Sequence, residues 1–307
     1  MIPRRFIHIL PRRSRVPIEV SQNLKNIAAR NPEWEQMILY DDDVEELFAQ
    51  YFSSQDWLRF NQIDKAYGPA RADFLRYLLL FEFGGVYLDG KSGLAKPIDQ
   101  ILDPTDEFVI SQWDTTQQSR FGRYLPAPEV SHIAGGEYQN WFIACAERHD
   151  LMAHVLSGIR ENIDNYSVEK FGAGKPGVLK TTGPIAYTQS ISQYIHDYPV
   201  RFLNCFQSGL LYSAMGDTDA HRYLFRMHYS FLNHPIIRPH SGRGMMRFEL
   251  KKQSSKLHAW LRILNRKLRD AYRLSKSIAR KTESATWQVL FVNTPMHQGK
   301  KNDATRR

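Results

Sequence analysis

Short apolar runs and helix-spaced apolar positions alternate along the first part of the chain, and they predict strands and helices in turn. Arg4–Leu10 and Gln36–Tyr40 are short, mostly apolar runs of the kind that form strands. Between them, Pro17–Arg30 carries its apolar residues at helical spacing and predicts a helix. Three consecutive aspartates then cap a second helix, which we expect to extend through Phe48. This order of elements is typical of an α/β fold with a parallel sheet.

The most informative stretch is Tyr67–Asp89. Its first part predicts a helix that ends at Gly84 and Gly85, where a left-handed backbone is required. A short strand follows, and the alternation of side chains along a strand places Tyr87 and Asp89 on the same face. Ligands of open α/β sheets bind beyond the carboxyl ends of the strands. The aromatic ring and the carboxylate at this strand end are therefore candidates for ligand binding.

Four later segments have patterns that predict structure. Phe108–Ser111 predicts a strand, and Asn140–Ile159 predicts a strong amphipathic helix. Ser167–Lys180 is rich in glycine and lysine and is expected to be a loop. Gly183 precedes a proline and starts a helix that we expect to end near Asp197.

Length and composition indicate a folded protein without structural disulfides. The 307 residues give room for one large α/β domain with an appendage. Apolar residues make up 42% and charged residues 24%, which is typical of globular chains and excludes a disordered one. No run approaches the roughly 18 apolar residues of a membrane span, and the N-terminus lacks a secretory pattern. Cys145 and Cys205 exclude a disulfide framework and a multi-cysteine zinc site, so we expect buried free thiols in a cytoplasmic protein.

The positive charge of the chain is concentrated at its C-terminal end. Residues 250–307 carry 15 Lys and Arg residues against three acidic residues, whereas the net charge of the whole chain is +9. The rest of the chain is therefore mildly acidic, and no nucleic-acid-binding motif accompanies the basic part, so we expect no nucleic acid as partner. We expect a main domain over residues 1–249, a basic helical appendage over 250–297 and a disordered tail over 298–307.

The appendage predicts a basic amphipathic helix. Basic residues surround one apolar stripe made of Leu257, Trp260, Leu261, Leu264, Leu268 and Tyr272. Such a helix can lie on anionic lipid, and residues 256–281 would then contact a membrane surface. The alternative is a helix docked on the main domain with its basic face in solvent.

Residues 70–89 read A-x-x-D-x-x-R-x-x-x-L-x-x-x-G-G-x-Y-x-D. This pattern resembles the glycosyltransferases of family 32, the group with a sugar-binding region containing a DXD motif. The family includes yeast-type α-mannosyltransferases and bacterial capsular polysaccharide synthesis enzymes. Ile2–His8, Asn31–Trp34 and Gly183 with the following proline are also similar to family segments. The resemblance covers about residues 1–230.

The resemblance implies a type-A glycosyltransferase fold, which is a Rossmann-like mixed sheet flanked by helices. It also implies a nucleotide-sugar donor at the carboxyl edge of the sheet and transfer with retention at the anomeric carbon. Asp89 is similar to the first Asp of the DXD motif and is the implied metal ligand, and His228 lies near a late donor or metal contact of the family. The implied donor-binding residues are His8, Asp73, Arg76, Gly84, Gly85 and Tyr87.

Simpler structural readings of three of these residues stay open. Asp73 and Arg76 are three positions apart on one helix, so they could form a surface ion pair. His8 could be a histidine of the core or of a strand end.

The sequence departs from the family at the motif itself. Instead of Asp-X-Asp it has Asp89 followed by Gly90 and Lys91. In one account, Asp89 holds Mn²⁺ or Mg²⁺ with help from the diphosphate and water, since Mg²⁺ often takes one or two protein carboxylates. In the other, Lys91 neutralises the diphosphate as a point charge. The high charge of the diphosphate favours the retained metal.

The sequence thus predicts a glycosyltransferase in which Asp89 and Lys91 carry the catalysis. It would move a sugar from a nucleotide-sugar to a glycan or lipid-linked glycan acceptor in bacterial surface polysaccharide (capsule) synthesis. Its expected location is the cytoplasm, peripheral on the inner face of the cell membrane. The alternative is a catalytically inactive, membrane-associated scaffold or glycan-binding protein that kept the fold.

Overall fold

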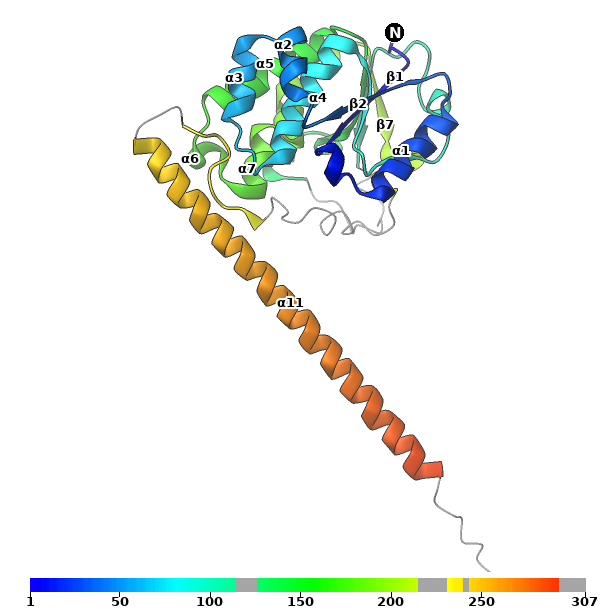
Figure 1. Ribbon diagram of the computed structural model, residues 1–307. Helices are drawn as coiled ribbons and strands as arrows, with labels where there is room; N and C mark the ends of the chain where they lie inside the picture. The colour runs from blue at the N-terminus through cyan, green and yellow to red at the C-terminus, as the bar shows by residue number, and fades with distance from the viewer. Residues whose placement is uncertain (114–125, 215–230, 240–242, 293–307) are drawn as a thin grey trace, which may run out of the picture. The chain divides into compact units, whose positions relative to one another are not determined.

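The computed structural model describes residues 1–113, 126–214, 231–239 and 243–292 (Figure 1). The chain divides into two compact units, Met1–Lys256 and Leu257–Arg307. Cys145 and Cys205 are buried and lie outside any disulfide, as predicted. Within the described ranges, no helix has the length and apolar character that a membrane crossing requires.

The first unit is built on a six-stranded mixed sheet with the strand order β2-β1-β3-β6-β5-β7. β1 pairs in parallel with β2 and β3, β5 pairs in parallel with β7, and β6 runs antiparallel to both of its neighbours. The predicted α/β fold with a mixed sheet is therefore confirmed. The parallel sheet expected from the order of the first elements is only part of it, because β6 is antiparallel to β3 and β5. The strands are β1 (Arg5–Leu10), β2 (Glu35–Tyr40), β3 (Gly85–Leu88), β5 (Phe108–Gln112), β6 (Tyr138–Cys145) and β7 (Val200–Asn204). A separate two-stranded sheet pairs β4 (Gly93–Leu94) with β8 (Leu210–Leu211).

Helices cover both faces of the sheet (Figure 1). α1 packs its buried residues Val20 and Leu24 into the cluster that holds Phe6 and Val86 of the sheet. α4 lies on the opposite face, where Tyr87 points. The helices of this unit are α1 (Ile18–Arg30), α2 (Val44–Tyr51), α3 (Ser54–Gln62), α4 (Gly68–Phe83), α5 (Asp150–Asp164), α6 (Val168–Phe171), α7 (Gly174–Thr181), α8 (Pro184–Ile191) and α9 (Cys205–Ser208).

Two glycines connect α4 to β3, as the sequence predicts. Gly84 has φ 59° and Gly85 has φ 105°, in the range that side chains disfavour. A Cβ atom on Gly84 would lie 2.5 Å from the backbone nitrogen of Glu147, and one on Gly85 would lie 2.6 Å from the carbonyl oxygen of Arg5. Both positions therefore require glycine for conformation and for space.

The predicted helix over Asn140–Ile159 is wrong in its first half. Residues Tyr138–Cys145 form β6, and the helix begins only at Asp150. All eight residues of β6 are buried, because neighbouring strands flank it and both faces are covered. A strand buried on both faces has no polar alternation, so periodicity cannot distinguish it from a buried helix.

The predicted loop over Ser167–Lys180 is also wrong, because this stretch forms α6 and α7. Ser167 accepts a hydrogen bond from the backbone N–H of Lys170 and caps α6. Gly177 lies where a Cβ would come within 2.7 Å of the carbonyl oxygen of Gly172, so its glycine serves close packing.

The structure also differs from the prediction at the end of α8 and at the start of α2. α8 begins after Gly183 as predicted but ends at Ile191, and Asp197 belongs to a separate 3₁₀ turn. Asp43 precedes α2 without a side-chain cap, since its carboxylate pairs with Arg13 instead.

The C-terminal helix α11 spans Arg243–Val292, so it begins in the first unit and continues into the second. The apolar stripe predicted from the sequence is exposed, and Trp260 and Leu268 have relative exposures of 54% and 60%. The predicted tail over residues 298–307 lies outside the described residues.

Candidate active site

The turn that follows β3 is fixed by two neighbouring segments and by one hydrogen bond within the turn. The backbone N–H of Asp89 donates to the carbonyl oxygen of Trp141 on β6 at 2.9 Å, and that of Ser92 donates to the carbonyl oxygen of Asp89 at 2.8 Å. The side-chain amide of Asn23 on α1 donates to the carbonyl oxygens of Gly90, at 3.1 Å, and Ser92, at 2.7 Å. The turn is therefore held in one conformation at the carboxyl edge of the sheet.

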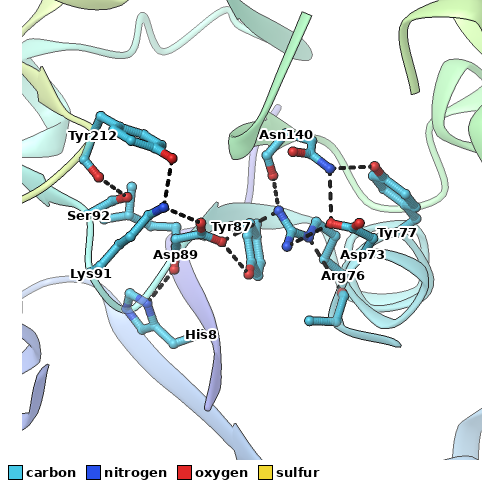
Figure 2. A network of polar contacts seen from close by, with 12 residues as sticks. His8, Asp73, Arg76, Tyr77, Tyr87, Asp89, Lys91, Ser92, Asn140 and Tyr212 are labelled. Carbon is cyan, nitrogen blue, oxygen red and sulfur yellow. Dashed lines mark hydrogen bonds and ion pairs between the residues drawn. The ribbon is translucent and has the colours of Figure 1, made fainter. Parts of the chain in front are cut away.

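Asp89 is supported from the sheet side and partly open on the other. The Tyr87 hydroxyl donates to its Oδ1 at 2.9 Å, and a guanidinium nitrogen of Arg76 lies 3.5 Å from the same oxygen. The Arg76 guanidinium also lies over the Tyr87 ring, 4.3 Å from the centroid. The side chain of Asp89 keeps 24% of its surface exposed. Figure 2 shows Asp89 between Lys91 on one side and Tyr87 with Arg76 on the other.

Lys91 is held by an aromatic group beside the turn. Its Nζ donates to the Tyr212 hydroxyl at 2.9 Å and lies 4.0 Å from the centroid of that ring (Figure 2). The Ser92 hydroxyl donates to the Tyr212 carbonyl oxygen at 2.9 Å. The Tyr212 ring packs edge-on against Trp113 and Trp141, with centroids 5.2 and 5.5 Å away. The Lys91 ammonium therefore lies in a defined place, 3.9 Å from Oδ2 of Asp89.

Behind the turn lies a second, buried pair on α4. Arg76 and Asp73 form an ion pair with an N–O distance of 3.0 Å. Asp73 also accepts hydrogen bonds from the Asn140 amide at 3.1 Å and the Thr182 hydroxyl at 3.2 Å, and Arg76 donates to the Asn140 carbonyl oxygen. Burial raises the pKa of Asp73 to about 7, against the opposing effect of Arg76.

Asp73 and Arg76 were expected either to bind the donor or to form a surface ion pair, and the structure has features of both. They do form the ion pair at i, i+3, but it is buried and not on the surface. Arg76 also reaches Asp89, so the pair belongs to the same polar network as the turn (Figure 2).

His8 and the two glycines lie apart from the open side of the turn. His8 is fully buried, its Nδ1 lies 2.8 Å from the Leu88 carbonyl oxygen, and burial lowers its pKa. It therefore supports the end of β3 as a neutral donor. Gly84 and Gly85 lie at the opposite end of β3 from Asp89. His228 lies outside the described residues.

Three residues of the site have no local signal in the sequence. Asn23 and Tyr212 contact the turn from positions 67 and 121 residues away from their partners. Asn140 lies in the segment that was predicted to be helical. Only the folded chain brings these side chains to the motif.

The residues at the turn do not form a divalent-cation site by themselves. Among the described residues, no three or more His, Cys, Asp or Glu side chains gather closely enough to hold a metal ion. Asp89 supplies one carboxylate, and its charged neighbours Arg76 and Lys91 are both cations. A single carboxylate can hold Mg²⁺ together with phosphate and water, but here each oxygen of that carboxylate has a cationic side chain beside it, so these side chains fit poorly with the ion that the resemblance implies.

Comparisons with known proteins agree with the motif. Residues 17–108 match the family described as "Glycosyltransferase sugar-binding region containing DXD motif". The predicted resemblance is thereby confirmed, because this range contains the segment 70–89 that carries it.

Two curated relatives come from Schizosaccharomyces pombe. "Inositol phosphoceramide mannosyltransferase 1" is 22% identical over 236 residues, which covers 72% of this chain and 65% of the relative. "Inositol phosphoceramide mannosyltransferase 3" is 26% identical over 98 residues, 32% of this chain and 27% of the relative. The chain thus spans less than two thirds of the length of these relatives.

Solved structures that match this chain include two that are named as glycosyltransferases. "PaToxG Glycosyltransferase" has a TM-score of 0.47 and 18% identity, covering 64% of this chain and 70% of that chain. The UDP-bound glycosyltransferase domain of the YGT toxin has a TM-score of 0.39 and 11% identity, covering 66% and 79%.

Proposed function

We propose that this chain, which carries the sugar-binding region of the DXD glycosyltransferases at residues 17–108, transfers a sugar from a nucleotide-sugar donor to an acceptor hydroxyl. The observation that supports this most is the turn at Asp89. The family match includes it, and the fold places it at the carboxyl edge of the sheet with a carboxylate and an ammonium partly open to solvent. Ligands of α/β sheets bind at this edge.

Asp89 and Lys91 are the residues to which we assign the chemistry. When the bond between the anomeric carbon and the diphosphate breaks, negative charge grows on the leaving diphosphate. A fixed ammonium next to that position stabilises the charge in the transition state. Lys91 is fixed in this way by Tyr212. We include retention at the anomeric carbon in the proposal, because the family resemblance implies it.

Arg76, Asp73 and Tyr87 are positioning residues in this proposal. Arg76 and Asp73 expose only 6% and 7% of their side chains, which leaves little surface for a ligand. Tyr87 donates to Asp89 and carries the Arg76 guanidinium on its ring. These contacts orient the Asp89 carboxylate toward the open side of the turn.

The acceptor class that we propose is a lipid-linked glycan or a glycolipid. The names of the two yeast relatives specify an inositol phosphoceramide, which is a lipid. Bacterial surface polysaccharide synthesis is compatible with the same chemistry, since its acceptors are also lipid-linked. The exposed stripe of α11 supports a location at a membrane surface, on the inner face of the cell membrane.

The membrane contact depends on charge as well as on apolar area. Residues 250–307 carry a large excess of positive charge, and the exposed stripe includes Trp260 and Leu264. We expect the full chain to sediment with vesicles that contain phosphatidylglycerol and not with phosphatidylcholine alone. The double substitution Trp260→Ser with Leu264→Asp should abolish this, whereas Ile18→Asp, at an exposed apolar residue of α1, should not. Equal sedimentation with both vesicle types would contradict the electrostatic contact.

Donor binding is the direct test of the enzymatic function. A ligand that binds the native state raises the melting temperature by mass action. We expect at least one member of a panel of UDP- and GDP-sugars to stabilise the full chain and to be hydrolysed slowly without acceptor. If every nucleotide-sugar stays intact and none shifts the melting temperature, the alternative of an inactive scaffold or glycan-binding protein is favoured.

A further inference from the structure

We propose that Lys91 takes the place of the divalent cation, so that the donor diphosphate binds at this turn without a metal ion. The inference rests on the proposed function, because it requires a diphosphate beside Asp89. It goes beyond that function by assigning the group that compensates the diphosphate charge.

The net charge of the turn is the same with Lys91 as with a second carboxylate and a divalent cation. A motif with two carboxylates has two negative charges, and a divalent cation neutralises both. The exchange of the second Asp for Lys91 replaces a negative by a positive charge, a change equal to the charge of a divalent cation. Asp89 and Lys91 together are therefore neutral without any ion, as two carboxylates are with one.

The Lys91 ammonium is held in place and still has hydrogen-bond donors for a ligand. An ammonium has three N–H donors, and the Tyr212 hydroxyl accepts one at 2.9 Å. The side chain keeps 19% of its surface exposed, and the Tyr212 hydroxyl uses only one of the three donors. Because Tyr212 and the turn fix the ammonium, little reorganisation is needed when a phosphate oxygen binds.

Both carboxylate oxygens of Asp89 have a positively charged side chain nearby. Its Oδ1 already accepts the Tyr87 hydroxyl, and Arg76 lies 3.5 Å from the same oxygen. Its Oδ2 lies 3.9 Å from the Lys91 ammonium. A cation bound to either oxygen would therefore lie close to a positive side chain and be repelled by it. The same two cations attract a diphosphate.

The test measures nucleoside diphosphate binding directly, by calorimetry on the full chain. The probes are UDP, GDP, ADP and dTDP, each in excess EDTA and again with Mn²⁺. We expect the nucleotide that binds wild type to do so with an affinity that differs by less than about threefold between the two conditions. Lys91→Gln should weaken this binding by about 10- to 100-fold in both conditions, because a hydrogen bond from a charged group is lost.

The sharper variant is Lys91→Asp, which restores the Asp-X-Asp motif. We expect it to bind the nucleotide poorly in EDTA and to regain binding with Mn²⁺, so that a metal requirement is created. Lys25→Asp makes the same charge change at an exposed residue of α1 and should behave as wild type. Circular dichroism of each variant establishes that it is folded, and the Lys91→Gln result stands if Lys91→Asp is not.

Each outcome decides the matter. Wild-type binding that is lost in EDTA and restored by Mn²⁺ would overturn the inference and leave the proposed function intact. Unchanged binding by Lys91→Gln would also overturn it. If no nucleoside diphosphate binds in either condition, the proposed function itself fails, and the inference fails with it.

Discussion

Two acid–base pairs lie along one polar network, and they differ in burial. Asp73 and Arg76 on α4 expose 7% and 6% of their side chains and lie 3.0 Å apart. Asp89 and Lys91 at the end of β3 expose 24% and 19% and lie 3.9 Å apart. Hydrogen bonds from within the protein satisfy the first pair. The second pair has a longer N–O distance and is partly exposed, so a ligand can reach it. The same residue types thus give a supporting pair in one place and a candidate catalytic pair in the other.

Arg76 joins the two pairs. Its guanidinium contacts Asp73, Asp89 and the ring of Tyr87. The buried pair therefore holds the open one in position, and the two should respond differently to substitution. Loss of a buried residue should lower stability first, and loss of an open one should lower binding or turnover first.

The largest expected effect is on stability, from Arg76→Ala. Removal of one partner of a buried ion pair leaves an uncompensated carboxylate, which costs about 3–5 kcal/mol. Urea denaturation of the full chain measures the free energy of unfolding. Arg4→Ala is the matched control, because Arg4 and Asp99 form an exposed pair at 3.8 Å that should contribute at most about 1 kcal/mol. Equal losses for both variants would remove the distinction between the pairs.

A smaller effect is expected from pH, through His8 beneath the turn. Burial lowers the pKa of His8, so below the usual histidine pKa of about 6.5 the unfolded chain binds a proton that the native chain does not. The contribution of His8 to stability is thus present above that pH and lost as pH falls, by up to about 1.4 kcal/mol per pH unit.

Urea unfolding at several pH values between about 7.5 and 5.5 measures this slope. Burial raises the pKa of Asp73 to about 7, so its titration opposes that of His8 in this range, and His8→Gln should shift the slope toward greater stability at low pH relative to wild type. His196→Gln, at an exposed histidine, should leave the slope as it is in wild type. If His8→Gln has the same pH dependence of the unfolding free energy as wild type, His8 does not contribute to that dependence.

The smallest expected effect is at the open pair, from Tyr212→Phe. The substitution removes the acceptor of the Lys91 hydrogen bond and keeps the ring beside it. A single hydrogen bond contributes about 0.5–1.5 kcal/mol, so the donor KM should rise about threefold to tenfold with little change in melting temperature. Tyr51→Phe, on the exposed side of α2, serves as control. An unchanged KM would mean that Lys91 needs no support from Tyr212.

Much of the fold near the motif is predictable because its signals are local. The end of α4 at Gly84 and Gly85 follows from the backbone conformation that only glycine adopts readily. β1 and β2 follow from short apolar runs. β6 does not, because its burial on both faces removes the alternation that marks a strand.

The site is predictable only where the motif is contiguous. Tyr87, Asp89 and Lys91 lie together in the sequence and in space. The burial of Asp73 and Arg76 is not predictable from the sequence, because both lie off the apolar face of α4. In the folded chain, Asn140 of β6 and Thr182 after α7 cover that side. Tyr212 comes from a distant segment, and no local pattern points to it.

The initial rate of sugar release from the nucleotide-sugar donor, compared between wild type and Asp89→Asn, tests the central claim most directly. The substitution keeps the size of the side chain and an oxygen for the Tyr87 hydroxyl, and it removes the negative charge of a partly exposed group. The account predicts a rate at least about 100-fold lower with a melting temperature close to that of wild type. Near-normal turnover by folded Asp89→Asn would contradict the assignment of this turn as the reaction site.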